Sequence, residues 1–373
     1  MKRIFDAALV LISAAFVTLF GALVLISPQK SFSESENRAL AKAPKIEAKS
    51  LVNGDFFEAL SDFFCDQFPL RPLFVSVRTA TELSLGRGEN NGVVFAEDGY
   101  LITSPSYGSL SLYEKNLAAL SRFCEERRDI GDSVSVFFAP RGADVLTSKL
   151  GELYPKENLS SVWGMAKKRL PDLITATEEL RMAAERDEYV WFRTDHHWTS
   201  LGAYRAYLAL AEPLGFTPLP LEHWDFERMS ESFLGTVYSK SGAYSVSPDQ
   251  IDIPHSGAEL TVTYHEKNKE IHSLYDMQKL STKDKYAVFL GGNFSHVSVR
   301  GNSPRPRLVL IKDSFANALI PYLAEHFDLE IYDLRYFKGS IGGELDGYGE
   351  SNILILYGID TAVSDGSLSY LVR

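Results

Sequence analysis

Two apolar runs near the C-terminal end constrain the fold most. Residues 307–311 (RLVLI) and 352–357 (NILILY) are apolar at nearly every position. A strand that is apolar on both faces is typical of a parallel sheet with helices on both sides. Residues 111–128 and 200–211 have helical apolar spacing, and residues 133–138 read as another strand. This alternation predicts an α/β fold with a parallel sheet between helical layers.

The N-terminal segment predicts a membrane anchor. Lys2 and Arg3 precede twenty uncharged residues, 7–26, which is long enough to cross a hydrocarbon core of about 30 Å. A cleaved signal peptide has a shorter apolar core and a small-residue cleavage site, and neither is evident here. The basic tail predicts that the N-terminus stays in the cytoplasm and the rest lies outside it.

The predicted organisation has three parts. Residues 1–27 form the cytoplasmic tail and transmembrane signal anchor, residues 28–50 form a polar stalk, and residues 51–373 form the catalytic domain. Within that domain, residues 215–285 interrupt the α/β rhythm and are interpreted as an insertion or lid.

Charge and cysteine content narrow the class of protein. The 373 residues carry a formal net charge of −11 and contain no block of lysine and arginine, so nucleic acid is not an expected partner. The two cysteines, Cys65 and Cys124, do not make a disulfide framework. They either pair outside the cytoplasm or remain buried free thiols.

The sequence Asp195-His196-His197-Trp198 concentrates groups that can transfer protons. It follows a predicted strand at 188–192 and precedes the helix at 200–211, and catalytic groups of α/β proteins gather at such strand ends. An aspartate close before a histidine can accept the N–H of the imidazole and leave its other nitrogen free as a base. The alternatives are a helix cap and a metal site. Adjacent side chains on a helix point about 100° apart, so His196 and His197 are poorly placed to bind the same metal ion.

Ser314 has the position of a nucleophile. It follows the apolar strand at 307–311 and opens a predicted helix at 316–326, where free N–H groups can stabilise an oxyanion. A serine or aspartate there can equally be a helix cap, and Asp313 is such an aspartate. A further strand is predicted at 286–290, before Gly291, Gly292 and Asn293.

Several motifs together resemble the DHHW protein family. These are TDHHW (194–198), LGGN (290–293), the stretch that begins LVLIKDSF at 308, and IYDLRYF (331–337). The sequence is similar to alginate O-acetyltransferase proteins, and the resemblance covers about residues 90 to 360. It implies an SGNH-hydrolase-like, three-layer α/β/α fold with a central, mainly parallel sheet.

The resemblance also implies roles for individual residues. Ser314 is the nucleophile, His197 the base and Asp195 the residue that orients it, while Gly292 and Asn293 with the Ser314 N–H form the oxyanion hole. Further candidates that line the site or serve the fold alone are His196, Arg141, Arg335 and Tyr357. No cofactor is implied.

The expected function is transfer of an acetyl group to a hydroxyl of a polysaccharide through an acyl-serine, outside the cytoplasm. The resemblance implies that a multi-pass membrane O-acyltransferase delivers the acetyl donor. An acetylesterase uses the same three residues with water as acceptor, so it remains an alternative. A polysaccharide-binding scaffold without activity is the other alternative.

Overall fold

The computed structural model describes residues 2–33, 38–104, 110–151, 154, 157–243 and 246–372. The chain divides into two compact units. The first comprises residues 1–91 and 239–245, and the second comprises residues 92–238 and 246–373. The predicted division into tail, stalk and catalytic domain stays a prediction.

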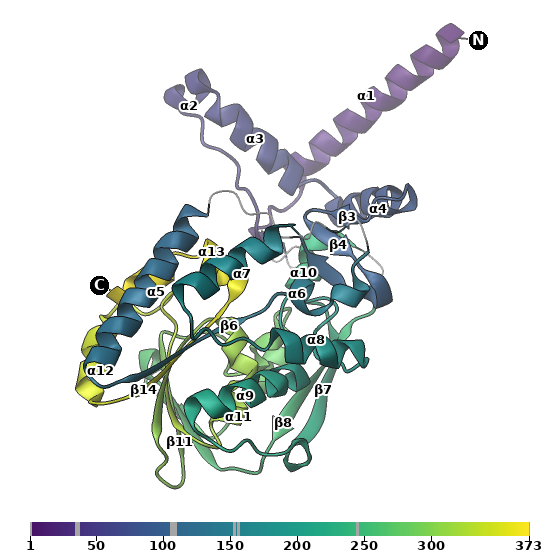
Figure 1. The fold of residues 1–373 in the computed structure, drawn as a ribbon. Coiled ribbons are helices and arrows are strands. Elements are labelled where there is room, and N and C mark those ends of the chain that lie inside the picture. Colours follow the sequence, from purple (N-terminus) through teal and green to yellow (C-terminus); the bar gives the residue numbers. More distant parts are fainter. Residues whose placement is uncertain are drawn as a thin grey trace. The chain divides into compact units, whose positions relative to one another are not determined.

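The first unit is mostly helical (Figure 1). Within the described chain, the segment Arg3–Ile26 of α1 is the helix that is long and apolar enough to cross a membrane. Its length and composition fit a single-pass anchor. The elements of this unit are α1 (Lys2–Ile26), β1 (Phe32–Ser33), β2 (Arg38–Ala39), α2 (Ala48–Asn53), α3 (Asp55–Asp66), α4 (Arg71–Ser84) and β3 (Glu89–Asn90).

The second unit is built on a seven-stranded sheet with the order β10-β9-β11-β13-β12-β14-β6. Strands β13, β12, β14 and β6 are parallel to one another, and β11 joins β13 antiparallel. Strand β9 is antiparallel to β11 and therefore runs with the parallel group. The bounds are β6 (Ser133–Ala139), β9 (Leu260–Tyr264), β10 (Lys269–Ile271), β11 (His296–Gly301), β12 (Arg307–Lys312), β13 (Asp328–Tyr332) and β14 (Asn352–Gly358).

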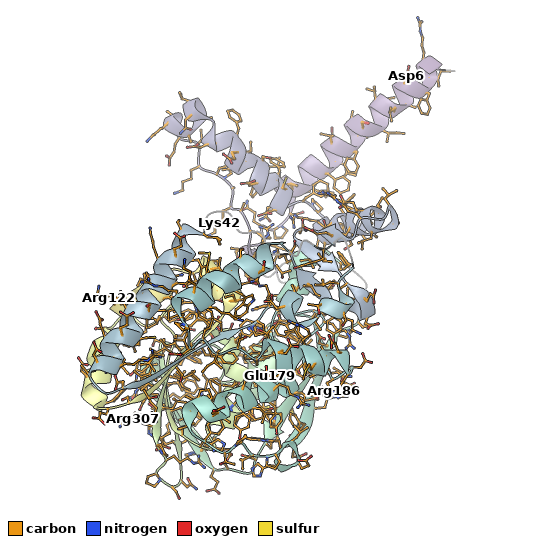
Figure 2. The ribbon with its side chains drawn as sticks, viewed as in Figure 1. Asp6, Lys42, Arg122, Glu179, Arg186 and Arg307 are labelled. Carbon is orange, nitrogen blue, oxygen red and sulfur yellow. The ribbon has the colours of Figure 1, made fainter. Side chains whose placement is uncertain are left out.

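Helices cover both faces of this sheet, which confirms the predicted three-layer architecture. The alternating side chains of β6 separate the layers, since Val136 and Phe138 face one core and Phe137 faces the other. One layer holds α5 (Ser111–Asp129), α7 (Glu157–Arg169), α12 (Ile341–Tyr348), α13 (Ile359–Ser364) and η8 (Ser367–Val372); the other holds α6 (Gly142–Val145), α8 (Thr177–Glu185), α9 (Ser200–Leu214) and α11 (Ile320–Leu323). Charged side chains such as Arg122 and Arg307 lie at the surface (Figure 2).

Smaller elements surround the sheet. A hairpin is formed by β4 (Val93–Phe95) and β5 (Leu101–Thr103) around η1 (Glu97–Gly99). A second antiparallel pair joins β7 (Asp225–Phe233) to β8 (Asp249–His255). The remaining short helices are η2 (Thr147–Lys149), η3 (Leu221–His223), α10 (Thr236–Ser241), η4 (His265–Lys267), η5 (Met277–Ser281), η6 (Lys285–Val288) and η7 (Ser314–Ala318).

The segment 215–285, interpreted from sequence as an insertion or lid, contributes two strands of the main sheet, β9 and β10. It also carries the β7–β8 pair. Its role as a lid stays a prediction.

Three local predictions are wrong. Residues 188–192 are not a strand of the sheet, because only an isolated bridge joins Trp191 to Trp198. Residues 286–290 overlap the 3₁₀ helix η6 instead of forming a strand. The continuous helix expected at 316–326 is divided into η7 and α11 at Leu319. Pro321 lies in the first turn of α11, where a missing N–H is tolerated. Proline cannot donate the hydrogen bond that would continue η7 into α11 as one helix.

Candidate active site

The structure brings together the three residues that the sequence selects. The Ser314 hydroxyl Oγ lies 2.9 Å from Nε2 of His197. Nδ1 of the same ring lies 2.6 Å from Oδ1 of Asp195. Both distances fall in the range for a hydrogen bond along which a proton can move. The arrangement can therefore raise the nucleophilicity of a serine hydroxyl.

Ser314 is positioned by the centre of the sheet. It lies two residues beyond β12, which pairs with β13 on one side and β14 on the other. Asp313 fixes the turn, because its carboxylate accepts the N–H of Phe315 at 2.9 Å and the N–H of Gly358 at 2.8 Å. Asp313, not Ser314, caps the short helix η7. The serine hydroxyl is thereby left to His197.

The loop that carries Asp195 and His197 lies between α8 and α9. Thr199 caps α9, with its side chain accepting the N–H of Gly202 at 3.2 Å. Asp249 at the start of β8 holds the other side of the loop. Its carboxylate accepts the N–H of Arg193 at 2.8 Å and the N–H of Thr194 at 2.7 Å.

A second loop saturates the carboxylate of Asp195. Its Oδ2 accepts the N–H of Thr236 at 2.7 Å and the Thr236 hydroxyl at 2.9 Å. Gly235 makes this approach possible, because a Cβ at that position would lie 2.3 Å from Cβ of Asp195. The orientation of Asp195 is therefore set from both ends of its carboxylate.

The charge states follow from these contacts. Burial disfavours ionisation of Asp195, but the two histidines and the hydrogen bonds from His197 and Thr236 hold its pKa well below the ordinary value. Burial, with a smaller contribution from His196, lowers the pKa of His197 to about 4 although Asp195 opposes this shift. At neutral pH the pair is thus a carboxylate beside a neutral imidazole, which is the form that acts as a base.

Aromatic rings confine the His197 imidazole. The Tyr286 ring stacks on it with centroids 3.9 Å apart and planes 7° apart, and Phe315 packs at 4.9 Å. The Tyr286 hydroxyl also donates to the carbonyl oxygen of Ser314 at 3.1 Å. Tyr286 was not predicted as a site residue, because it lies in a segment interpreted as a strand and no spacing links it to residues 195–197.

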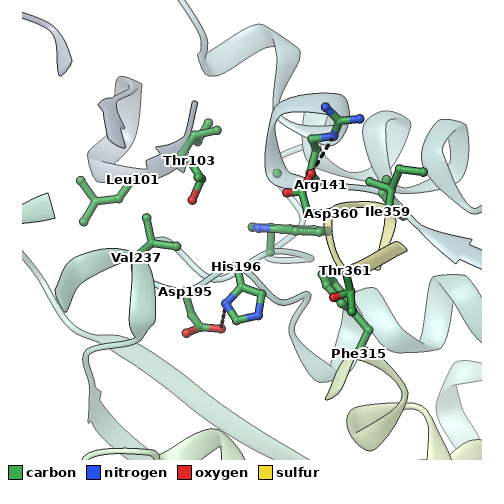
Figure 3. Close-up of a pocket in the computed structure, with 14 residues that line it drawn as sticks. Leu101, Thr103, Arg141, Asp195, His196, Val237, Phe315, Ile359, Asp360 and Thr361 are labelled. Carbon is green, nitrogen blue, oxygen red and sulfur yellow. Dashed lines mark ion pairs between the residues drawn. The ribbon is translucent and has the colours of Figure 1, made fainter. Parts of the chain in front are cut away.

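His196 lies beside the three residues and faces a pocket. Its Nδ1 lies 2.7 Å from the Thr236 hydroxyl, and its ring packs against His197 with centroids 3.8 Å apart. The pocket is open to solvent and its hollow, counted with that open space, measures about 460 Å³; Figure 3 shows how its side chains lie. Those labelled there are Leu101, Thr103, Arg141, Asp195, His196, Val237, Phe315, Ile359, Asp360 and Thr361.

Gly292 and Asn293 are held by a buried polar group behind the serine. The Gly292 N–H donates to the Phe289 carbonyl at 3.2 Å. Oδ1 of Asn293 accepts from Nζ of Lys312 at 2.8 Å and from the Asn317 amide at 3.2 Å. Burial lowers the pKa of Lys312 to about 8 although Asp333 opposes the shift. The Gly292 N–H is therefore engaged, while the Asn293 amide is fixed through its oxygen.

The three remaining candidates have different surroundings. Arg141 lines the pocket and forms ion pairs with Asp144 at 3.2 Å and Asp360 at 3.6 Å. Arg335 makes a two-pronged contact with the Asp333 carboxylate at 2.8 and 2.6 Å. Tyr357 is fully buried in the core on the α5 side of the sheet. Of the three, only Arg141 is among the residues that line this pocket.

Asp195, His196 and His197 also meet a distance criterion for a metal site, since one ligand atom of each lies within 4.8 Å of the others. However, the His197 nitrogens face Asp195 and Ser314, and Nδ1 of His196 faces Thr236. A metal ion would have to displace these hydrogen bonds. The observed contacts favour proton transfer at this position.

Two family models match parts of the chain. The model described as DHHW protein matches residues 175–333, which include Asp195, His197 and Ser314. The model described as SGNH hydrolase-like domain, acetyltransferase AlgX, matches residues 93–231. The resemblance predicted from the sequence is therefore confirmed.

Known proteins agree with these matches. The chain is 27% identical over 179 residues to a protein of Pseudomonas putida described as probable alginate O-acetylase AlgJ, covering 45% of this chain and 46% of that protein. The same description applies to a Pseudomonas aeruginosa protein that is 26% identical over 200 residues, with coverage of 51% and 49%. The chain thus spans about half the length of the curated relatives it matches.

Solved structures support the fold. A DHHW family protein from Eubacterium siraeum has a TM-score of 0.64 and 25% identity, covering 76% of this chain and 96% of its own. PatB1 of Bacillus cereus, in a structure with a sulfonyl adduct, has a TM-score of 0.61 and 18% identity, with coverage of 74% and 97%. The fold predicted from the sequence, an SGNH-hydrolase-like α/β/α arrangement, is confirmed.

Proposed function

We propose that this chain is an O-acetyltransferase that moves an acetyl group to a hydroxyl of a polysaccharide outside the cytoplasm. The observation that carries the proposal is the hydrogen-bonded series Ser314, His197 and Asp195 beside an open pocket. The similarity to proteins described as probable alginate O-acetylases supports acetyl transfer to a polysaccharide. The proposed substrates are inferred from relatives that this chain matches along about half of their length.

The first half of the reaction forms an acyl-enzyme. Ser314 Oγ attacks the acetyl carbonyl carbon of an ester donor while its proton moves to Nε2 of His197. Asp195 holds the Nδ1–H and stabilises the imidazolium that forms. The tetrahedral intermediate collapses when His197 returns the proton to the departing alcohol, and the acetyl group stays on Ser314.

The negative oxygen of this intermediate needs N–H donors. The Ser314 N–H and the side-chain amide of Asn293 are the proposed donors. Lys312 and Asn317 bind the oxygen of that amide, which supports a role for its nitrogen as the group presented to the substrate. Gly292 contributes through chain geometry, because its own N–H donates to Phe289.

The second half transfers the acetyl group. A sugar hydroxyl in the pocket loses its proton to His197 and attacks the acetyl carbonyl carbon, and the Ser314 alkoxide recovers the proton from His197. The ester to the sugar is the product. Arg141, Asp360 and the exposed edge of His196 supply polar contacts in that pocket, and Leu101 and Val237 supply apolar contacts.

The proposed setting is the outer side of a membrane. Helix α1 serves as a single-pass anchor with a cytoplasmic N-terminus. An acetyl donor on that side of the membrane has to be supplied across it, and a multi-pass membrane O-acyltransferase is the proposed source. Protease added to intact spheroplasts should therefore digest residues of the second unit; protection of these residues would reverse the orientation.

The function is tested by following both protein and sugar. The full chain is incubated with an activated acetyl ester and candidate polysaccharides, and both are analysed by mass spectrometry. We expect a transient acetyl group on Ser314 and stable acetyl esters on one polysaccharide. A sulfonyl fluoride should label Ser314 stably; a sulfonyl adduct is described for PatB1. Ser314→Ala should lose both signals, whereas Ser230→Ala on the exposed strand β7 should keep them.

The outcomes separate the alternatives. Acetate release at the same rate with and without every polysaccharide would identify an acetylesterase. Tight binding of a polysaccharide without acetylation or labelling of Ser314 would identify a scaffold. Either result would replace the proposed transferase.

A further inference from the structure

Helix α4 in the first unit exposes its apolar side and buries polar residues. Leu70, Leu73, Phe74 and Val77 follow the spacing of one helical face, and each exposes between 43% and 63% of its surface. We call these four residues the α4 apolar face. The buried residues of the helix are instead the polar Ser76 and Thr79. A soluble helix buries its apolar stripe, so this orientation needs an apolar environment outside the protein.

The inward polar face is held to the rest of the unit through Asn90, and its other hydroxyl bonds are made within α4. The Ser76 hydroxyl donates to the Pro72 carbonyl at 2.6 Å, and the Thr79 hydroxyl donates to the Val75 carbonyl at 3.0 Å. Thr79 Oγ1 also accepts the Asn90 amide at 2.8 Å. Rotating α4 to bury its apolar face would break the bond from Asn90, whereas the two bonds to carbonyls of α4 itself would turn with the helix. The exposure is therefore a property of the folded unit.

The α4 apolar face is continuous with the predicted membrane anchor. Phe20 of α1 stacks on Phe68 with centroids 4.9 Å apart, and it meets the Phe74 ring edge-on at 5.9 Å. Phe20 lies six residues before Ile26, where α1 ends. At 1.5 Å per residue, that is about 9 Å inside the end of the helix. Phe74 therefore lies at a depth where α1 itself is within the membrane.

The charges of this unit distinguish α4 from α3. Three arginines, Arg71, Arg78 and Arg87, occur in or just after α4, against the single Glu82. Glu82 pairs with Arg78 at 2.9 Å and with Arg87 at 3.1 Å, so the group keeps a net positive charge. Helix α3 carries only acidic groups, Asp55, Glu58, Asp62 and Asp66. A helix with an apolar face and basic flanks is the kind that lies in the interface of an anionic membrane.

We propose that α4 is a membrane-surface helix, whose apolar face lies in the lipid interface beside α1 and whose Arg78 and Arg87 contact anionic phospholipid headgroups. The chain then holds the membrane by a spanning helix and a helix parallel to the surface. This inference does not depend on the chemistry of Ser314. It identifies the partner of the α4 apolar face as lipid.

The test uses the full chain with an environment-sensitive fluorophore. Cys65→Ser removes the exposed thiol, and Cys124 is buried. In this background, Val77→Cys carries the label on α4, and Glu58→Cys carries it on exposed α3 as the matched control. The proteins are reconstituted in liposomes of phosphatidylcholine and phosphatidylglycerol. We expect the label at 77 to emit at shorter wavelength and to be quenched by spin-labelled lipids, and the label at 58 to do neither.

Headgroup contact is tested in the same liposomes. In Arg78→Gln/Arg87→Gln, the lipid-inserted population of the label should decrease by about fivefold per arginine when phosphatidylglycerol is present. It should change little in pure phosphatidylcholine. A label at 77 that remains as water-accessible as the one at 58 would overturn the proposal. So would shielding that appears only in native membranes and not in liposomes, because a protein partner would then cover the face.

Discussion

The serine half and the histidine half of the candidate site are held in different ways. Each depends on a buried aspartate that accepts backbone N–H groups. Asp313 is next to Ser314 and accepts from Phe315 and from Gly358 at the end of the adjacent strand β14. Asp249, by contrast, lies in β8, and it accepts the N–H of Thr194, which is 55 residues earlier in the chain.

The comparison shows which half is held by the paired strands of the sheet and which is held by contacts between loops. The serine is placed by regular parallel pairing, so a strand end and a turn residue suffice to position it. The loop with Asp195 and His197 is not part of a paired β-strand. It relies on Asp249 and on the Gly235–Thr236 segment, both of which fold from later parts of the chain. The histidine half should therefore be the more sensitive to distant substitutions.

The largest expected effect tests whether the two halves act as one unit. Ser314→Ala and His197→Ala should each lower kcat by about 10⁶-fold, and the double variant should be no worse than either. The reason is that neither group can work without the other. Acetyl transfer and circular dichroism are measured on all three, with His196→Ala as the control that retains activity within about tenfold. Multiplicative losses in the double variant would show that the residues act separately.

The next effect concerns Asp195. Asp195→Asn should lower kcat by about 10⁴-fold, because an amide no longer fixes the Nδ1–H tautomer of His197. Gly235→Ala should also reduce activity, since its Cβ would lie 2.4 Å from Oδ2 of Asp195 and force the carboxylate to move. Kinetics with an activated acetyl ester measure both. Full activity in Gly235→Ala would mean that the position of Asp195 is not limiting.

A third prediction compares two carboxylates of the same strand. Asp249→Asn leaves a buried backbone N–H without its acceptor, so the free energy of unfolding should fall by about 2–4 kcal/mol. Asp252→Asn removes only a partly exposed ion pair with Arg228 and should cost less than about 1 kcal/mol. Urea denaturation measures the difference. Equal destabilisation would contradict the role of Asp249 in holding the histidine loop.

Sequence reasoning reached the parts of the fold and site that depend on local pattern. The runs at 307–311 and 352–357 indicated buried parallel strands, and Ser314 follows directly from the first. The link between Asp195 and His197 was also accessible, because it spans two residues. Tyr286, Thr236 and Asp249 were missed, since they reach the site only through the tertiary fold. A sequence pattern cannot predict, for example, that the ring of Tyr286 stacks on the imidazole of His197.

The predicted strands at 188–192 and 286–290 failed for a related reason. Both are apolar because they are buried, and burial alone does not distinguish a strand from an irregular segment. Val190 and Phe289 are almost completely buried, but Val190 lies in a loop and Phe289 follows a 3₁₀ helix. Their backbone groups bond to nearby turns instead of neighbouring strands.

The smallest expected effect is on the pH profile, and it isolates the environment of His197. Burial lowers the pKa of this imidazole to about 4, so the acidic limb of kcat/KM should lie near pH 4 instead of near 6.5. Folding favours the neutral ring, so stability is greatest above the unfolded pKa and falls as the pH drops from about 6.5 toward 4.

His196 provides the control for that limb. Because the neighbouring His196 is the second contribution that lowers the pKa of His197, His196→Ala should move the acidic limb to higher pH while leaving the plateau within about tenfold of the parent. Tyr286→Phe keeps the stacked ring and its burial, so its limb should not move. The measurement is kcat/KM for an activated acetyl ester between pH 3.5 and 8, a window set by the two pKa values near 4 and 6.5. An acidic limb near 6.5 in the parent would show that water reaches the imidazole in solution. The loop that carries His197 would then open to water in solution, and the two halves of the site would differ in mobility as well as in the way they are held.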